Sequence, residues 1–174
     1  MSTNRIGTSM VLAATVGLLA LLTWLFSDHL DRQRNPNQDI EQAVAPSGAA
    51  RVALQRNRAG HYLAVGQMNG VSAELMLDTG ATDVAVPEAV ARRAGLPRGR
   101  KVQVVTANGY THAFATTIKT LQIGSIIEHD VPASIVPNMT DIEVLLGMSF
   151  LKRLDFTQRG DQLILESRRT STVE

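Results

Sequence analysis

The chain has 174 residues, of which 44% are hydrophobic and 19% are charged, so it has room for one domain with extensions. The formal net charge of +1 argues against nucleic acid as the main partner, because a surface that follows phosphates needs a basic excess. The chain has no cysteine, which excludes thiol catalysis, disulfides and thiolate metal sites.

An uncharged segment occupies residues 6–26, and its part from Met10 to Phe26 is almost entirely apolar. About 20 apolar residues span the hydrocarbon core of a bilayer, so this pattern predicts a transmembrane helix. A cleaved signal peptide is the alternative, but no small-x-small cleavage site follows the segment closely. We therefore expect residues 1–26 to form a short tail and an uncleaved membrane anchor. The short tail and the bulky remainder favour a domain outside the cytoplasm.

The character of the sequence changes twice after this segment. Residues 27–50 are polar or small, include two prolines and show neither helical nor strand periodicity, which predicts a flexible stalk. From Arg51 onward, short apolar runs alternate with turn residues, as is typical of an all-β domain. We expect this domain to cover residues 51–166 and the last residues, 167–174, to form a disordered tail.

Within the domain, turn residues mark hairpins and a change of period marks a helix. Asn69-Gly70 is a strong two-residue hairpin signal, and Pro87 followed by a helical pattern that ends before Gly95 predicts a short helix. A further hairpin is expected across residues 107–109, and a helical turn or two within 148–154. The expected strands are residues 61–67, 71–77, 84–86, 102–105, 110–118, 121–127, 131–136, 144–146 and 156–165, the last folded around Gly160.

Residues 75–80, Leu-Met-Leu-Asp-Thr-Gly, place a carboxylate at the end of an apolar strand. Desolvating a charged carboxylate is costly, so Asp78 is either paired or held for chemistry. A plain strand-to-turn end, in which the aspartate bonds local amides, is the alternative reading. The same triplet does not recur elsewhere in the chain.

The run LMLDTGATDVAVP, the hairpin around Asn108-Gly109 and the closing LLGMSFLKRL together resemble the retropepsin-type aspartic proteases. More narrowly, they resemble a bacterial, single-domain, membrane-anchored branch of that family. The resemblance covers residues 51–166 and implies a closed β fold with one or two short helices. It also implies that Asp78 is the catalytic residue.

The resemblance assigns further roles around Asp78. Many retroviral members have an acidic residue where this chain has Thr82, so the viral dimer contacts cannot be carried over. The implied site consists of Thr79, Gly80 and Ala81 in the active-site loop, Asp83, Asn108 and Gly109 at the substrate and flap, and Leu146 and Gly147 packed beneath the loop.

Hydrolysis of a peptide bond without a metal requires one group to activate water and another to protonate the leaving group. Two carboxylates that share one proton do both, because like charges about 3 Å apart cannot both ionise. A single Asp-Thr-Gly therefore requires a symmetric homodimer in which Asp78 of each subunit meets the other. No metal, cofactor or nucleic acid is expected. The histidines show no metal-ligand spacing, and Ser149 is interpreted as structural.

These observations predict a membrane-anchored, homodimeric aspartic endopeptidase that acts on peptides or proteins. The implied location is a bacterial inner membrane, with residues 6–26 in the bilayer and the domain in the periplasm. Two alternatives stay open: a non-catalytic peptide-binding or adaptor module on the same fold, and a monomeric structural domain. Retention of both Thr79 and Gly80 beside Asp78 disfavours the adaptor.

Overall fold

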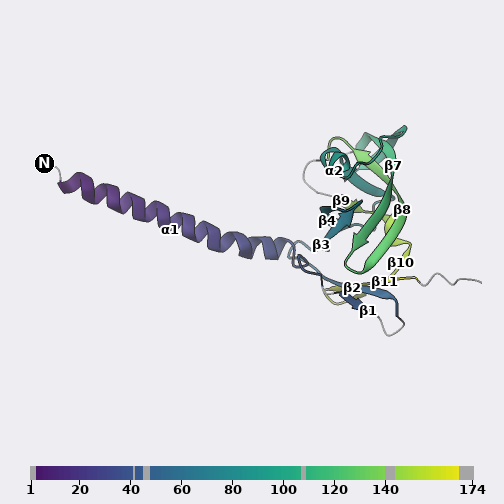
Figure 1. The fold of residues 1–174 in the computed structure, drawn as a ribbon, viewed down its shortest axis with the longest axis horizontal. Helices are drawn as coiled ribbons and strands as arrows, with labels where there is room; N and C mark the ends of the chain where they lie inside the picture. The colour runs from purple at the N-terminus through teal and green to yellow at the C-terminus, as the bar shows by residue number, and fades with distance from the viewer. Residues whose placement is uncertain (1–2, 41, 45–47, 107–108, 140–143, 169–174) are drawn as a thin grey trace, which may run out of the picture.

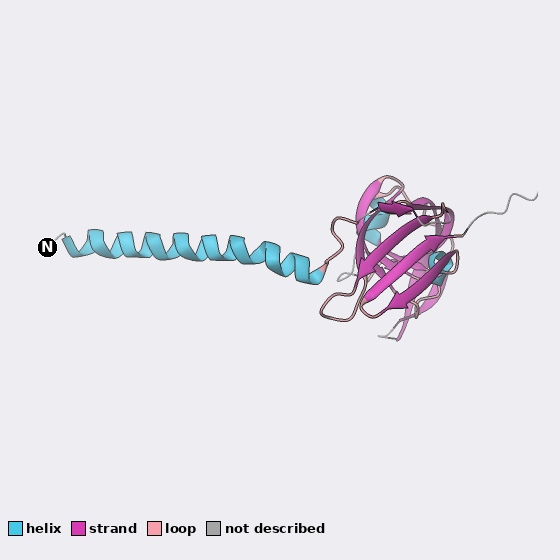
Figure 2. Ribbon diagram, turned by 90° about the horizontal axis from the view of Figure 1, so that it is seen from below, coloured by secondary structure: helices cyan, strands magenta, loops and turns pink. Residues whose placement is uncertain are grey.

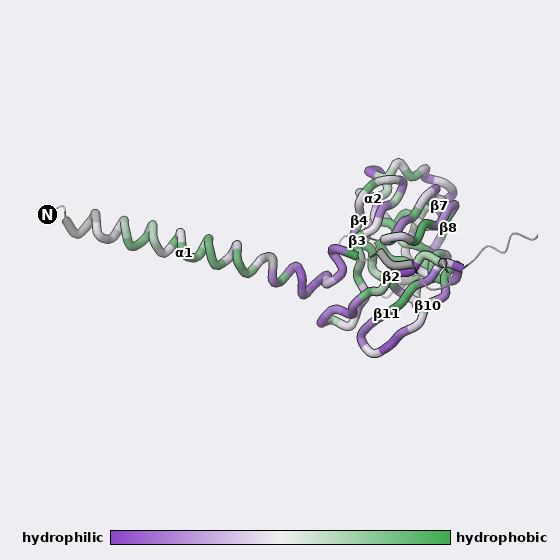
Figure 3. Tube along the Cα trace, turned by 60° about the horizontal axis from the view of Figure 1, so that its bottom comes forward, coloured by the Kyte–Doolittle hydropathy of each residue, from purple (hydrophilic) through white to green (hydrophobic). Residues whose placement is uncertain are grey.

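The computed structural model describes residues 3–40, 42–44, 48–106, 109–139 and 144–168. It consists of a long helix, α1 (Thr3–Arg34), and a β domain that lies beyond the end of this helix (Figure 1). Within α1, Ser9–Arg34 has the length and composition of a membrane span, with a mean hydropathy of 2.1 and no burial against the domain. A signal sequence near an N-terminus has the same properties. Figure 3 shows the apolar stretch along α1 in green.

The structure differs from the expectation of an irregular stalk over residues 27–50. Helix α1 continues eight residues past Phe26, because each residue added to an existing helix gains a hydrogen bond at little entropic cost. It ends at Arg34, immediately before the residue that precedes Pro36, where proline disfavours helical backbone. After it, strand β1 (Gln42–Val44) pairs antiparallel with β2 (Ala50–Gln55).

The described part of the domain contains two sheets and two short helices. The four-stranded sheet has the order β1-β2-β11-β10, with β10 (Leu154–Arg159) and β11 (Gln162–Ser167) joined as a hairpin through Gly160. The second sheet has seven strands in the order β3-β4-β9-β5-β8-β7-β6. These strands are β3 (Leu63–Met68), β4 (Val71–Leu77), β9 (Val144–Leu146), β5 (Val84–Pro87), β8 (Ile126–Val136), β7 (Gly109–Ile123) and β6 (Lys101–Thr106).

Strand β3 also pairs with β7, through Gln67 and Met68 opposite Gln122 and Leu121, so the larger sheet curls back on itself (Figure 2). The predicted all-β, closed fold is therefore confirmed. The predicted helix after Pro87 is α2 (Glu88–Arg93), followed by Gly95 with φ of 63°. A second short helix, α3 (Met148–Leu151), lies within the expected range.

The hairpin turns follow the sequence signals where the structure describes them. Asn69 and Gly70 have φ angles of 51° and 81°, which is the left-handed backbone that a two-residue hairpin turn requires. The turn at residues 107–109 lies partly outside the described residues. So does the expected tail, of which Ser167 belongs to β11 and Arg168 pairs with Asp155.

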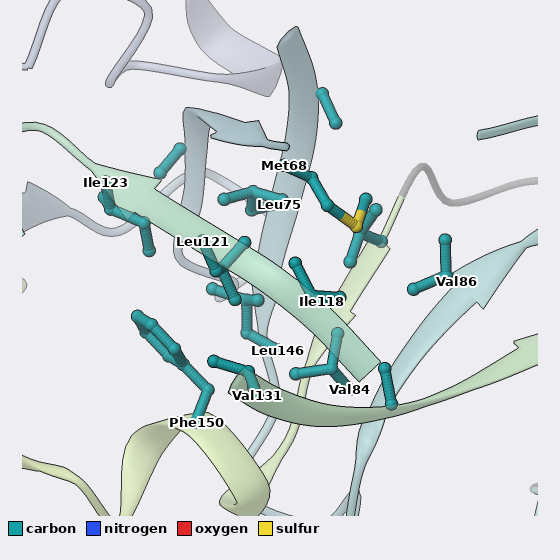
Figure 4. Packing of buried hydrophobic residues seen from close by; sticks show 14 of the residues in the cluster. Met68, Leu75, Val84, Val86, Ile118, Leu121, Ile123, Val131, Leu146 and Phe150 are labelled. Carbon is teal, nitrogen blue, oxygen red and sulfur yellow. The ribbon is translucent and has the colours of Figure 1, made fainter. Parts of the chain in front are cut away.

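The core fills the space inside the curled sheet (Figure 4). Leu75 from β4, Leu146 from β9 and Phe150 from α3 are all fully buried within it. Burial of side chains this large contributes about 1.5–3 kcal/mol each, so the strand ends near Asp78 are anchored by the interior.

Ser149 connects three elements next to the loop that follows β4. Its side chain is almost fully buried, its Oγ donates to the carbonyl of Pro132 at 2.8 Å, and the same oxygen accepts from the amide of Val84 at 3.0 Å. It therefore joins α3 to β8 and to the start of β5. The structural interpretation of this serine agrees with these contacts.

Replacing Ser149 by alanine should lower the free energy of unfolding by about 1–3 kcal/mol, because it leaves the buried amide of Val84 and the part-buried carbonyl of Pro132 without that partner. Thermal unfolding of the full-length protein in detergent measures the change. Ser72→Ala, at an exposed position of β4, is the matched control and should stay within about 0.5 kcal/mol. Equal unfolding midpoints for both variants would contradict the bridging role.

Candidate active site

Asp78 follows directly after β4, at a strand end that is held from both sides. The amide of Leu77 donates to the carbonyl of Tyr62 at 3.0 Å, and the amide of Asp78 donates to the carbonyl of Leu146 at 3.0 Å. Strand β9 runs parallel to β4 here, with Leu77 opposite Leu146. These backbone hydrogen bonds therefore fix the backbone of Asp78 independently of its side chain.

The loop after β4 orients the carboxylate by itself. The amide of Gly80 donates to Oδ1 of Asp78 at 2.8 Å, and the amide of Ala81 donates to the carbonyl of Asp78 at 3.3 Å. Asp78 is half-buried, while Thr79 and Gly80 are exposed. A Cβ at Gly80 would lie 3.2 Å from the same carboxylate oxygen, so a larger residue would crowd the group. One carboxylate oxygen is thus held at a turn that faces solvent.

Gly147 brings the next strand against this loop. A Cβ at Gly147 would lie 2.3 Å from the carbonyl oxygen of Asp83 and 2.6 Å from that of Ala81, both far inside contact distance. The amide of Met148 donates to the carbonyl of Ala81 at 2.8 Å, and the amide of Ser149 donates to that of Thr82 at 2.9 Å. Only glycine permits this approach, since these neighbours are backbone atoms that cannot move aside.

The structure therefore brings together most of the residues that the sequence singled out. Asp78, Thr79, Gly80, Ala81 and the backbone of Asp83 form one loop, and Leu146 and Gly147 lie directly against it. The side chain of Asp83 is exposed just before β5.

The expected flap belongs to another part of the sheet. Gly109 begins β7 opposite Thr106 and has φ of 100°, so it lies at the tip of the β6–β7 hairpin. Asn108 lies outside the described residues. The placement of this tip over Asp78, and the roles given to Asp83, Asn108 and Gly109 in substrate binding, stay predictions.

Sequence reasoning did not single out Tyr62, although its carbonyl holds the end of β4. A signal was present, because the register of a hairpin turning at Asn69-Gly70 places Tyr62 opposite Leu77. It also assigned Asn35 and Asn37 to the stalk, whereas both are almost fully buried. The dipeptides around Pro36 were the available signal, since asparagine beside proline is common where side chains bond local backbone.

The chemistry available to one chain is incomplete. The loop presents a single oriented carboxylate, and the described residues contain no cluster of three or more His, Cys, Asp or Glu that could hold a metal. A cavity of about 310 Å³ lies elsewhere, between residues 38–40 and strands β3, β4 and β7, and none of its lining residues belongs to the loop of Asp78. A reaction that needs both an acid and a base requires a second group at this loop.

Comparison with known proteins agrees with this geometry. The family described as "gag-polyprotein putative aspartyl protease" matches residues 64–153. An uncharacterized protein from the cobV 5' region of a Sinorhizobium species is 32% identical over 122 residues, which are 68% of this chain and 52% of that protein. The chain thus spans about half the length of this curated relative.

A solved structure extends the likeness to three dimensions. The crystal structure of a retropepsin-like aspartic protease from Rickettsia conorii is 30% identical, with a TM-score of 0.59 over 74% of this chain and 96% of the other. The family match covers the loop of Asp78 together with Leu146 and Gly147. The chain therefore belongs to the retropepsin-like aspartic proteases.

Proposed function

We propose that this chain is a membrane-anchored, homodimeric aspartic endopeptidase. The observation that carries the proposal is the Asp-Thr-Gly loop, in which Asp78 is held at a strand end and its Oδ1 accepts the amide of Gly80. The family and the fold support protease activity. A non-catalytic site that only bound peptides would not need this loop to be intact.

In the proposed reaction, Asp78 of one subunit and Asp78 of the other hold one water molecule between them. The water attacks the peptide carbonyl carbon while one carboxylate takes its proton and the other gives its proton to the carbonyl oxygen. A carboxylic acid of the pair then protonates the amide nitrogen, the C–N bond breaks, and the products are a carboxylic acid and an amine. The amide of Gly80 fixes one oxygen of each carboxylate, so the pair needs little reorganisation during the reaction.

The dimer in this proposal is two-fold symmetric, because each chain supplies one Asp-Thr-Gly. Thr79 is exposed at the loop and is available for contacts across the axis. Substrate would lie extended between the loop and the β6–β7 hairpin and would add backbone hydrogen bonds as a strand does. Asp83, Asn108 and Gly109 are the proposed contacts with it.

The proposed location follows from α1. Residues 6–26 would cross the inner membrane of a bacterium, and the domain would lie in the periplasm. The apolar composition of the helix and the exposure of its large hydrophobic side chains between Met10 and Leu30 support an anchor, since a soluble helix hides one face. The two relatives named above come from Sinorhizobium and Rickettsia.

Replacing Asp78 by asparagine should lower peptide cleavage by at least about 100-fold, because an amide cannot accept the proton of the water. The measurement is cleavage of a peptide library by the full-length protein in detergent. Asp155→Asn is the matched control: Asp155 lies on exposed β10 in a surface ion pair with Arg168, so its loss should leave activity unchanged. Near-normal cleavage by Asp78→Asn would exclude the aspartic mechanism, and no cleavage by the unmodified protein would favour the adaptor.

A mixing experiment tests the shared site. If subunits exchange freely, a fourfold excess of Asp78→Asn should reduce the activity per unmodified chain to roughly one fifth, because most unmodified chains then pair with an inactive partner. Substrate is kept in large excess so that inactive dimers do not deplete it. A fourfold excess of Asp155→Asn is the control and should not reduce the activity. Undiminished activity with Asp78→Asn, after exchange has been shown by a tag, would contradict a site built from two chains.

The anchor has a test of its own. The full-length protein should remain with membranes after an alkaline wash and keep its whole mass. Leu18→Arg combined with Leu19→Arg should release it, because each arginine at the centre of a span costs about 2.5–3.5 kcal/mol on insertion scales. A shortened, soluble product from the unmodified gene would show instead that the segment is a signal sequence.

A further inference from the structure

The end of α1 is bonded firmly to the β domain. Arg34 forms an ion pair with Glu74 of β4 at 2.7 Å, and Nδ2 of Asn35 donates to the other oxygen of the same carboxylate at 3.0 Å. Nδ2 of Asn57 donates to the carbonyl of Arg34 at 2.8 Å, and Arg58 donates to Gln33 at 2.8 Å. The last turn of the helix therefore has side-chain bonds to two separate parts of the domain.

Asn37 extends this attachment into the interior. It is 5% exposed, and its Nδ2 donates to the carbonyls of Gln55 at 2.9 Å and Leu63 at 2.7 Å. Its Oδ1 accepts the amide of Gln55 at 2.7 Å, and its own amide donates to Oδ1 of Asn35 at 2.9 Å. We call Arg34, Asn35 and Asn37 the anchor clasp. Asn35 and Asn37 are buried and bonded to the domain, while Arg34 is exposed. A buried network whose polar groups are satisfied is rigid, so we expect the helix and the domain to move as one piece.

The anchor clasp lies at the same end of the β3–β4 hairpin as the catalytic loop. Asn37 bonds the carbonyl of Leu63, and the neighbouring carbonyl, that of Tyr62, accepts the amide of Leu77, which precedes Asp78. Asn37 and Asp78 are thus roughly 10–15 Å apart, given ordinary spacings between bonded strands and between consecutive residues. In Figures 1 and 3, β3 and β4 are the strands next to α1, and β7 and β8 lie on the far side.

The length of α1 sets the height of the site above the membrane. Residues 27–34 continue the helix beyond the apolar segment, which adds about 12 Å at 1.5 Å per residue. The 10–15 Å from the anchor clasp adds fully only along the helix axis, so Asp78 lies up to about 27 Å from the hydrocarbon core, and the headgroup layer fills roughly the first 5–8 Å of that distance. An extended chain crosses about 25 Å in seven or eight residues.

If both helices of the dimer are anchored in one bilayer, both must leave the domain pair on the same side. The two-fold axis of the dimer therefore lies along the membrane normal. The catalytic loops, which meet at that axis, are then held at one fixed height. Substrates tethered in the same membrane meet this height at a high effective concentration, whereas free peptides do not.

We propose that the substrates are membrane-anchored proteins cut in the segment about 6–10 residues beyond their own transmembrane helix. This inference rests on the proposed function, in which the chain is an anchored protease. The rigid anchor clasp restricts cleavage to one distance from the membrane, because a flexible stalk of the same length would let the site reach many heights.

The test places one cleavable sequence at several distances from a transmembrane helix. The sequence is taken from a library digest by the full-length protein in detergent, and it is set 3, 8 or 40 residues beyond the helix of a test substrate. Enzyme and substrate are reconstituted together in phosphatidylcholine vesicles. We expect the fastest cleavage at 8 residues, little at 3, and about tenfold slower cleavage at 40, because effective concentration falls with roughly the −3/2 power of tether length.

A lengthened enzyme serves as the second measurement. Seven helix-forming residues inserted between Phe26 and Ser27 add two turns, about 10 Å, and turn the domain by only about 20°. The anchor clasp is untouched, so cleavage of the free peptide should not change, while the preferred spacing should move outward by about three residues.

The outcomes separate this inference from the proposed function. The inference would be overturned if the free peptide is cleaved but the rate of tethered cleavage does not depend on spacing. It would also be overturned if the insertion does not change the preferred spacing. Neither result would contradict the proposed protease activity. Failure to cleave either the free or the tethered sequence would overturn the protease activity, and the inference with it.

Discussion

The contact between Gly147 and the loop of Asp78 is the constraint on which the rest of the site depends. Backbone carbonyls of Ala81 and Asp83 lie where any side chain at Gly147 would have to be. The same close approach lets β9 lie between β4 and β5 and supply the carbonyl of Leu146 to the amide of Asp78. The position of the carboxylate is therefore set by backbone hydrogen bonds, which vary less than contacts between side chains.

A carboxylate fixed in this way is ready for chemistry but has only half of the groups that peptide hydrolysis needs. Gly80 orients one oxygen of Asp78, and Ser149 beneath the loop joins α3 to β5 and β8. In the proposed dimer, two such loops meet at the two-fold axis and the partner subunit supplies the second carboxylate, so a domain this small would suffice for the proposed reaction.

The second constraint is the attachment of α1. An anchor joined by a loose stalk would keep the domain near a membrane without fixing its orientation. Asn37, with bonds to both Gln55 and Leu63, couples the end of the helix to both sheets. Glu74, which binds Arg34 and Asn35, belongs to β4, the strand that ends immediately before Asp78. The loop of Asp78 and the end of α1 are thus both joined to β4, so the position of one constrains the position of the other.

The sequence by itself determined the all-β fold, the Asn69-Gly70 hairpin, the helix after Pro87 and the carboxylate at Asp78, because alternation, turn residues and short motifs are local signals. It failed over residues 27–50, where polar composition indicated a stalk although the helix continues to Arg34 and Asn37 is buried. Only the tertiary structure decided that Gly147 and Ser149 support the loop and that the end of α1 is bonded to the strand that leads to Asp78. These contacts join residues far apart in the chain. Local sequence periodicity does not indicate which distant backbone atoms a buried asparagine or glycine will contact.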